Sequence, residues 1–181
     1  MNRIAVHTAA ALLAFAALTG CNAASNKSAD VSQTVRKALD GAGLKDVTVS
    51  QDRDKGIVTL GGKVTTEDDK SRATFLVRPL VDNQVVASEI AVLPVGDEKD
   101  AKSINKDLDK GIEHNVDAAL VAAKIHGGVK YDVKNGVVTL SGEVDSQAKR
   151  TSTEHLIAVV PNVKQVINTL QVKGQKATSS N

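Results

Sequence analysis

The sequence GIVTLGGKV at residues 56–64 recurs 80 positions later as GVVTLSGEV at residues 136–144. Seven of the nine positions are identical or exchange one β-branched aliphatic residue for another. The chain is therefore a tandem duplication. A period of 80 is longer than the roughly 20 to 50 residues of a solenoid repeat, and it predicts two small domains of about 65 to 70 residues each.

The apolar and turn residues around these stretches predict the same order of elements, αββαβ, in both units. In unit one we expect, in chain order, a helix after Asp30, strands over 47–51 and 57–64, a helix that begins at Thr65 or Thr66, and a strand over 84–92. In unit two we expect a helix over 104–124, a hairpin with its turn at Asn135-Gly136, a helix over 146–160, and a strand over 163–172. The predicted fold class is α+β, with a small three-stranded sheet packed against two helices in each unit.

Four glycines recur with the repeat, and we predict structural roles for them. Gly56 and Gly136 fall at the two hairpin turns, where glycine is favoured because it tolerates a positive φ. Gly62 and Gly142 fall inside or at the end of a strand, where the missing side chain permits a bulge or a close approach of backbone.

The N-terminus predicts export and lipidation. Arg3 precedes an apolar run over 4–18, which is shorter than the roughly 20 residues needed to cross a bilayer and is typical of a signal peptide. The run leads into LTGC at residues 18–21, which resembles the bacterial lipobox. We therefore expect cleavage before Cys21 and attachment of lipid chains such as palmitate to Cys21, enough for stable membrane anchoring. The alternative is a secreted protein that is cleaved nearby without lipidation.

The residue after Cys21 predicts the location within the cell envelope. In bacterial lipoproteins the residue after the lipidated cysteine sorts the protein between membranes, and here it is Asn22. This resemblance implies the outer membrane, with the protein on its periplasmic side.

The chain without its signal peptide is close to neutral and poor in aromatic residues. Removal of residues 1–20 leaves 161 residues, with 22 basic and 21 acidic side chains and with Phe75 and Tyr131 as the only aromatics. Nucleic-acid binding depends on excess positive charge and on aromatic stacking. We therefore expect no nucleic-acid partner.

The boundaries between units follow from composition. The stretch from Pro94 to Lys102 is charged and rich in turn residues, which is typical of a linker. The expected organisation is a signal peptide over 1–20, the lipidated cysteine and a tether over 21–29, domain 1 over 30–95, a linker over 96–103, domain 2 over 104–173, and a flexible tail over 174–181.

The two units resemble a known family. A glycine-led Val-Thr-Leu strand, a second glycine, a polar helix start and the approach Pro161-Asn162-Val163 to the last strand are similar to the BON domain. Two such units behind a lipobox resemble the dual-BON envelope lipoproteins, relatives of the osmotically inducible periplasmic protein family. The resemblance implies a non-enzymatic protein that associates with phospholipid and supports envelope integrity or osmotic stress tolerance. The alternative is a periplasmic chaperone-like or scaffolding module that binds envelope proteins.

In some lipid-binding members of that family, the long first helix of the second domain meets anionic phospholipid through an aromatic residue. The stretch 104–124 departs from this pattern because it holds no aromatic residue. It does carry basic residues that could contact anionic phospholipid, and the predicted lipid-binding set is Lys106, Lys110, Lys124 and Lys130. Acidic residues share the helix, so an ordinary solvated helix face is the alternative interpretation.

The sequence contains no complete catalytic or metal-binding set. Ser146 and Lys149 have the Ser-x-x-Lys spacing of some acyl-transfer enzymes, but the companion motifs are missing and Ser146 is better placed as a helix cap. The acidic turn over 52–56 lacks the remaining ligands of a calcium loop. We therefore expect no enzyme activity, no cofactor and no bound metal.

Overall fold

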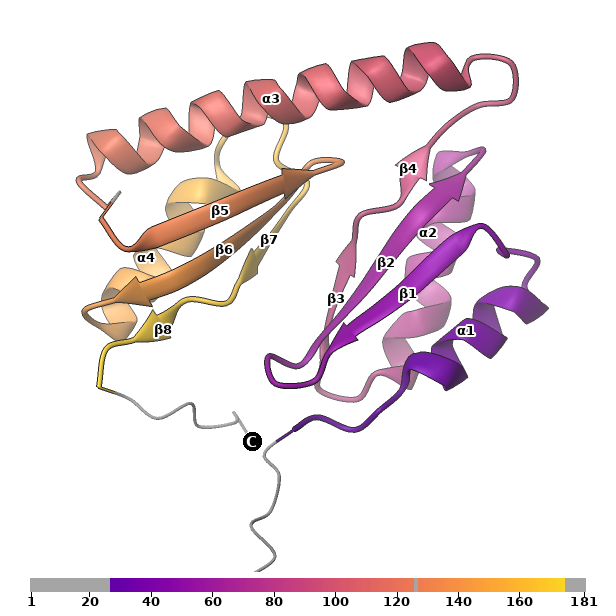
Figure 1. Cartoon of the computed structure of the whole chain (residues 1–181), viewed down its shortest axis with the longest axis horizontal. Helices are drawn as coiled ribbons and strands as arrows, with labels where there is room; N and C mark the ends of the chain where they lie inside the picture. The colour runs from indigo at the N-terminus through magenta and orange to yellow at the C-terminus, as the bar shows by residue number, and fades with distance from the viewer. Residues whose placement is uncertain (1–26, 126, 175–181) are drawn as a thin grey trace, which may run out of the picture.

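The computed structural model describes residues 27–125 and 127–174. It contains two units of similar fold that follow each other along the chain, and each unit has two helices on one face of a sheet (Figure 1). The predicted signal peptide, Cys21 and nearly all of the predicted tail lie outside the described residues.

Both units have the predicted αββαβ order, and the predicted α+β fold class is confirmed. Domain 1 consists of α1 (Ser32–Gly41), β1 (Val47–Asp52), β2 (Ile57–Val64), α2 (Glu67–Val77), the short 3₁₀ helix η1 (Arg78–Leu80), β3 (Val85–Ser88) and β4 (Ala91–Val92). Domain 2 consists of α3 (Glu98–Ala122), β5 (Val129–Lys134), β6 (Val137–Val144), α4 (Gln147–Ala158), β7 (Gln165–Asn168) and β8 (Gln171–Val172).

The two sheets have the same topology. In domain 1, β1 pairs antiparallel with β2 through the hairpin, and β3 and β4 both pair parallel with β2 on its other side. Domain 2 repeats this with β5, β6, β7 and β8. The single last strand that we predicted in each unit is thus two short strands. The interruption coincides with Ile90 in domain 1 and Leu170 in domain 2, and both side chains are buried in the cores.

Each domain has its own hydrophobic core between the helices and one face of the sheet. In domain 1, Val35 and Leu39 of α1 and Val77 of α2 pack against Val58 and Leu60 of β2. The equivalent residues in domain 2 are Val116, Leu120, Ile157, Val138 and Leu140. Because side chains alternate along a strand, the neighbouring residues of β2 and β6 point to the opposite, helix-free face of each sheet.

The helices that follow the hairpins begin at side-chain caps. The Thr66 hydroxyl accepts a hydrogen bond from the Asp69 amide at 3.1 Å, and the Ser146 hydroxyl accepts one from the Lys149 amide at 3.2 Å. Such caps satisfy amides that have no partner within the helix. Ser146 therefore serves to start α4, as its sequence context predicts.

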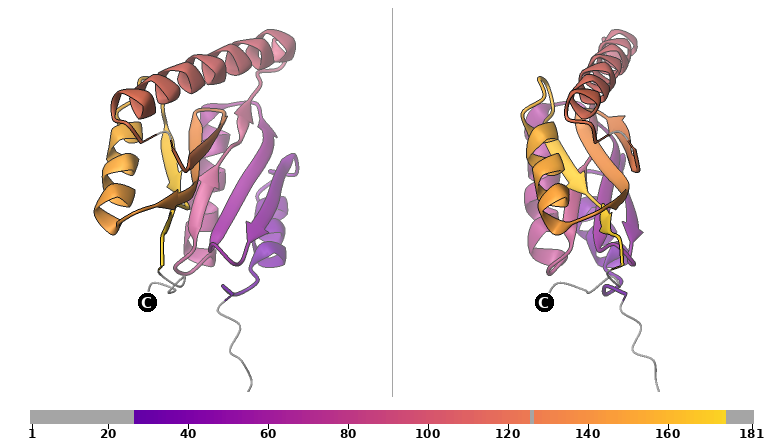
Figure 2. Two further views of the ribbon diagram at one scale, coloured as in Figure 1. Left: turned by 60° about the vertical axis from the view of Figure 1, so that its left-hand side comes forward. Right: turned by 90° about the vertical axis from the view of Figure 1, so that its left-hand side faces the viewer.

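Helix α3 is longer than predicted. It begins at Glu98, so that residues 98–103 of the predicted linker are helical, and it ends at Ala122. The charged residues that suggest a linker are also compatible with a helix, because Glu and Lys are good helix formers. Only five residues, 93–97, separate β4 from α3. The helix extends above both domains (Figures 1 and 2).

The repeated glycines have positive φ in both domains. Gly56 has a φ of +64° in the first hairpin turn, and Asn135 and Gly136 have φ values of +50° and +82° in the second, as a type I′ turn requires. Gly62 and Gly142 have φ values of +82° and +107°. A Cβ at either of these last two positions would collide with a backbone carbonyl oxygen, that of Asp46 or that of Gly128.

Candidate functional site

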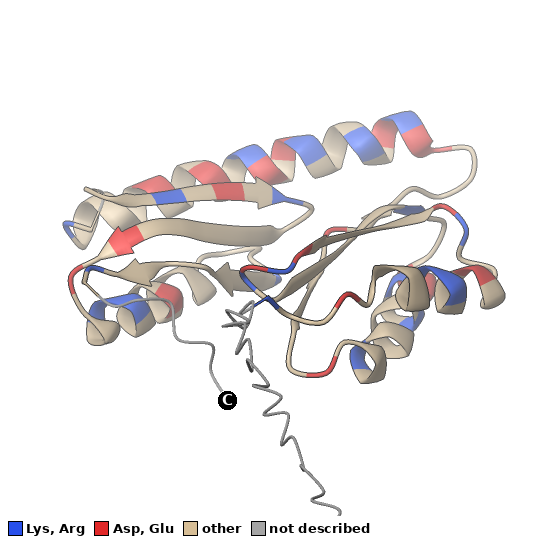
Figure 3. Cartoon of the chain, turned by 60° about the horizontal axis from the view of Figure 1, so that its bottom comes forward, with Lys and Arg blue, Asp and Glu red and all other residues tan. Residues whose placement is uncertain are grey.

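Helix α3 presents two of the predicted lysines on its exposed surface. Lys106 and Lys110 are one turn apart and exposed, and neither belongs to a salt bridge among residues 27–125 and 127–174. Val121 lies three turns beyond Lys110 on the same side and is 51% exposed. Glu113 and Asp117 lie between them, and Figure 3 shows the alternation of basic and acidic residues along this helix.

The other two predicted lysines lie elsewhere. Lys124 follows the end of α3 and has a left-handed φ of +57°. Lys130 is on β5, between Val129 and Val133, which both point into the core. Its side chain therefore points to the helix-free face of the sheet. The structure brings Lys106 and Lys110 together but does not join all four lysines into one cluster.

The apolar stripe of α3 extends beyond the core that it covers. Ile112, Val116 and Leu120 are buried, but Leu108 and Ile104, at the same helical spacing toward the N-terminus, are 47% and 58% exposed. Helical periodicity in the sequence does not distinguish the two groups, because it shows which residues share a face and not where the covering sheet ends.

Asp109 ties this half of α3 to the second hairpin. Its carboxylate accepts hydrogen bonds from the amides of Asn135 and Gly136 at 2.8 and 2.9 Å. The hydroxyl of Tyr131, on the preceding strand, donates to the Glu113 carbonyl at 3.3 Å. Partial burial, with smaller contributions from Asp117 and Glu113, raises the pKa of Tyr131 above its usual value. These contacts fix the orientation of α3 on domain 2.

The two domains contact each other through equivalent residues. Ile57 and Ala87 of domain 1 form a small apolar cluster with Val137 and Ile167 of domain 2, and each residue is at most 8% exposed. These residues form two pairs separated by the 80-residue repeat. All four lie on the helix-free faces of the sheets, so the junction is separate from both domain cores.

Polar contacts surround this apolar cluster. The Gln165 side-chain amide donates to the Val86 carbonyl at 2.8 Å and accepts from the Ser88 amide at 3.2 Å, and so covers the outer edge of β3. Asn135 donates to the Glu89 carbonyl at 2.7 Å, and Lys134 pairs with the largely buried Glu89 carboxylate at 2.8 Å. The hydrogen bond to Glu89 raises the pKa of Lys134.

Metal and membrane-spanning features are absent from the part of the chain that the structure describes. There, no group of three or more His, Cys, Asp or Glu side chains is close enough to hold a metal ion. No helix within the same residues is both long and apolar enough to cross a bilayer.

The duplicated sheet-and-helix units match a known family. Residues 27–94 and 108–174 match the family model of the BON domain, and the chain belongs to this family. It is 31% identical over 146 residues to osmotically-inducible protein Y of Escherichia coli strain K12, covering 79% of this chain and 71% of that protein. The predicted family is thus confirmed.

Two solved structures of CdsD, a structural protein of the type III secretion system of Chlamydia trachomatis, also show similarity. One, of the C-terminal domain, has 12% identity and a TM-score of 0.32, covering 78% of this chain and 65% of that chain. The other has 15% identity and a TM-score of 0.30, covering 77% and 60%. The chain thus spans about two thirds of these proteins or less, and similarity at this level carries no argument about function.

Proposed function

We propose that this protein is a non-catalytic, lipid-anchored protein of the bacterial outer membrane, facing the periplasm, that contacts anionic phospholipid and supports the envelope during osmotic stress. The observation that carries this proposal is the similarity to osmotically-inducible protein Y over a region that includes most of the chain. The lipobox-like stretch that ends at Cys21 supports anchoring, and Asn22 supports the outer membrane.

The proposed lipid contact is the exposed side of α3, with Lys106 and Lys110 at its centre and Lys124 just beyond the end of the helix. Lys130, on the helix-free face of the sheet, lies outside this contact. A basic side chain near an anionic membrane contributes about 1 kcal/mol. Two lysines alone give weak binding, but an acyl anchor holds the domains near the bilayer at an effective concentration of roughly millimolar order. Weak contacts can therefore orient a protein that its anchor already holds at the membrane.

Charge reversal tests this contact. The double variant Lys106→Glu, Lys110→Glu should bind vesicles containing phosphatidylglycerol about tenfold or more weakly, because two attractions become repulsions. The matched control is Lys37→Glu, Lys45→Glu, which changes the net charge equally at exposed lysines of domain 1. Vesicle sedimentation with the unlipidated chain measures the difference. Equal binding by both variants would exclude α3 as the contact.

The second candidate is a chaperone-like or scaffolding function toward envelope proteins. It is favoured by β1 and β5, six-residue strands that each pair with only one neighbour among the described residues. Such an edge can accept an extended segment of another protein as an additional strand. This function predicts suppression of client aggregation in the absence of lipid, and vesicle binding that the α3 variants leave unchanged.

A further inference from the structure

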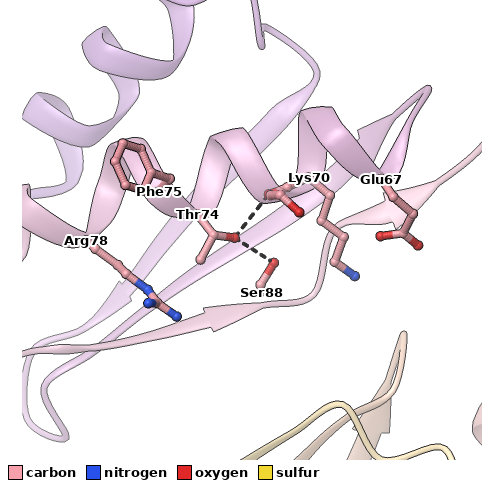
Figure 4. Close-up of a pocket in the computed structure, with 7 residues that line it drawn as sticks. Glu67, Lys70, Thr74, Phe75, Arg78 and Ser88 are labelled. Atoms are coloured by element: carbon pink, nitrogen blue, oxygen red, sulfur yellow. Dashed lines mark hydrogen bonds between the residues drawn. The ribbon is translucent and has the colours of Figure 1, made fainter.

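A groove between α2 and β3 in domain 1 is lined by two basic side chains and one acidic one. It has a volume of about 430 Å³ and is lined by Glu67, Lys70, Ser71, Thr74, Phe75, Arg78 and Ser88. In Figure 4 the charged ends of Lys70 and Arg78 extend from α2 and its continuation on the same side as Ser88. Neither Lys70 nor Arg78 forms a salt bridge within residues 27–125 and 127–174.

The equivalent place in domain 2, between α4 and β7, contains a carboxylate of the chain itself. At the positions 80 residues later, Arg150 replaces Lys70, Glu154 replaces Thr74 and Asn168 replaces Ser88. The Asn168 side-chain amide donates to the Glu154 carboxylate at 2.9 Å and to the Arg150 carbonyl at 3.1 Å. The Arg150 guanidinium donates to the Asn168 carbonyl at 3.3 Å. A carboxylate of the chain thus lies between α4 and β7.

Domain 1 lacks this carboxylate. Thr74 stands in place of Glu154, and its hydroxyl donates to the Lys70 carbonyl at 3.1 Å and lies 3.2 Å from the Ser88 hydroxyl oxygen. Because Thr74 uses its only proton on the carbonyl, the Ser88 hydroxyl donates either to the Thr74 oxygen or, in its place, to a ligand. Domain 1 also has Arg78 where domain 2 has Ala158, which adds a cation at the other end of the groove.

The pKa of Lys70 is consistent with a basic side chain that lacks an anion beside it. Its side chain is half-buried, and burial, followed by repulsion from Lys164 of domain 2, lowers the pKa of Lys70. Weaker attractions to Glu67, which lies 4.0 Å from the Lys164 ammonium, and to Asp109 act in the opposite direction on this pKa. An anion in the groove would stabilise the charged form of Lys70, since an opposite charge within a few ångströms offsets desolvation.

We propose that this groove binds a phosphate group from outside the chain, with Lys70 and Arg78 as the charged contacts and Ser88 as a hydroxyl donor. Phosphate is favoured over carboxylate because two basic side chains, Lys70 and Arg78, line the groove and can share the higher charge of a phosphate. Guanidinium and ammonium groups together are a common phosphate-binding pair. The phosphate is either a free ion or part of a lipid headgroup, and both present the same oxygens. The site is separate from the lipid contact proposed on α3.

Nuclear magnetic resonance of the ¹⁵N-labelled full chain tests the proposal. Inorganic phosphate, added against chloride at matched ionic strength, should cause saturable shifts of the backbone amides of residues 70, 74, 78 and 88. Saturation by inorganic phosphate identifies free phosphate as sufficient. Shifts at the same residues only with phosphatidylglycerol micelles identify the lipid headgroup as the source. No saturable shift at these residues with either probe would overturn the proposal.

Two variants make the test specific. Thr74→Glu with Ser88→Asn installs the residues of domain 2, keeps both cations and should weaken phosphate binding at least tenfold, because the new carboxylate occupies the place of the ligand. Lys70→Gln with Arg78→Gln removes the charged contacts and should have a similar effect. Phosphate shifts that persist unchanged in both variants would refute the site. Shifts of residues 106 and 110 report on α3, so the two proposals can fail separately.

Discussion

Replacement of Gly142 with alanine should reduce the free energy of unfolding of domain 2 by about 3 kcal/mol or more. Gly142 has a φ of +107°, and an added Cβ would collide with the carbonyl oxygen of Gly128. That oxygen accepts a hydrogen bond from the Glu143 amide at 3.0 Å, so it cannot move away without loss of this bond. Gly142 belongs to β6 and Gly128 directly precedes β5, so backbone movement here would disturb the β5–β6 ladder.

Urea unfolding followed by circular dichroism measures this effect. The control is Gly111→Ala in the middle of α3, where an added Cβ meets nothing within 4 Å. Alanine favours a helix over glycine, so this variant should gain up to about 1 kcal/mol. A Gly142→Ala protein as stable as the parent would show that the strand relaxes around the new methyl group and that the close approach is not required.

The second large effect is expected at the junction between the domains. Ile167 is 3% exposed in the interdomain cluster and lies outside the core of domain 2. Ile167→Asp would bury an unpaired carboxylate there, at a cost of several kcal/mol. We expect the small junction to open instead, because that exposes the carboxylate to water and leaves each domain folded.

Small-angle X-ray scattering and amide spectra together test this expectation. The variant should have a larger radius of gyration, and its amide shifts should change along β3 and β7 but not in the cores. Val159→Asp is the control, because Val159 belongs to the same domain and is 78% exposed. An unchanged radius of gyration in Ile167→Asp would mean that the interdomain arrangement does not depend on this cluster.

The repeat allowed most of the fold to be predicted, because each element was visible twice. The strand predicted over 57–64 has those bounds in the structure. The start of α3 was missed because Glu98 and the charged residues after it suit both a linker and a helix. The break in the last strands was missed because Ile90 and Leu170 continue the apolar pattern although they turn into the cores.

The groove in domain 1 was not predicted, although the sequence contains a signal for it. Aligning the units at the 80-residue offset places Thr74 against Glu154 and Ser88 against Asn168. What the sequence does not show is that these positions, on a helix and on a strand, face each other. Identical residues in the two units revealed the fold, whereas the residues that differ between them revealed the candidate site.

The contact between the domains is formed by Ile57 and Ala87 and by their counterparts in the repeat, Val137 and Ile167. A contact made by the same positions on both partners is what two identical subunits form around a two-fold axis. The protein thus has the organisation of a homodimer whose subunits are joined end to end. Covalent joining makes the pairing independent of protein concentration, so a small interface can suffice. Covalent joining also allows the sequences of the two halves to diverge. Gln165, for example, occupies the position that is equivalent to Val85 in domain 1.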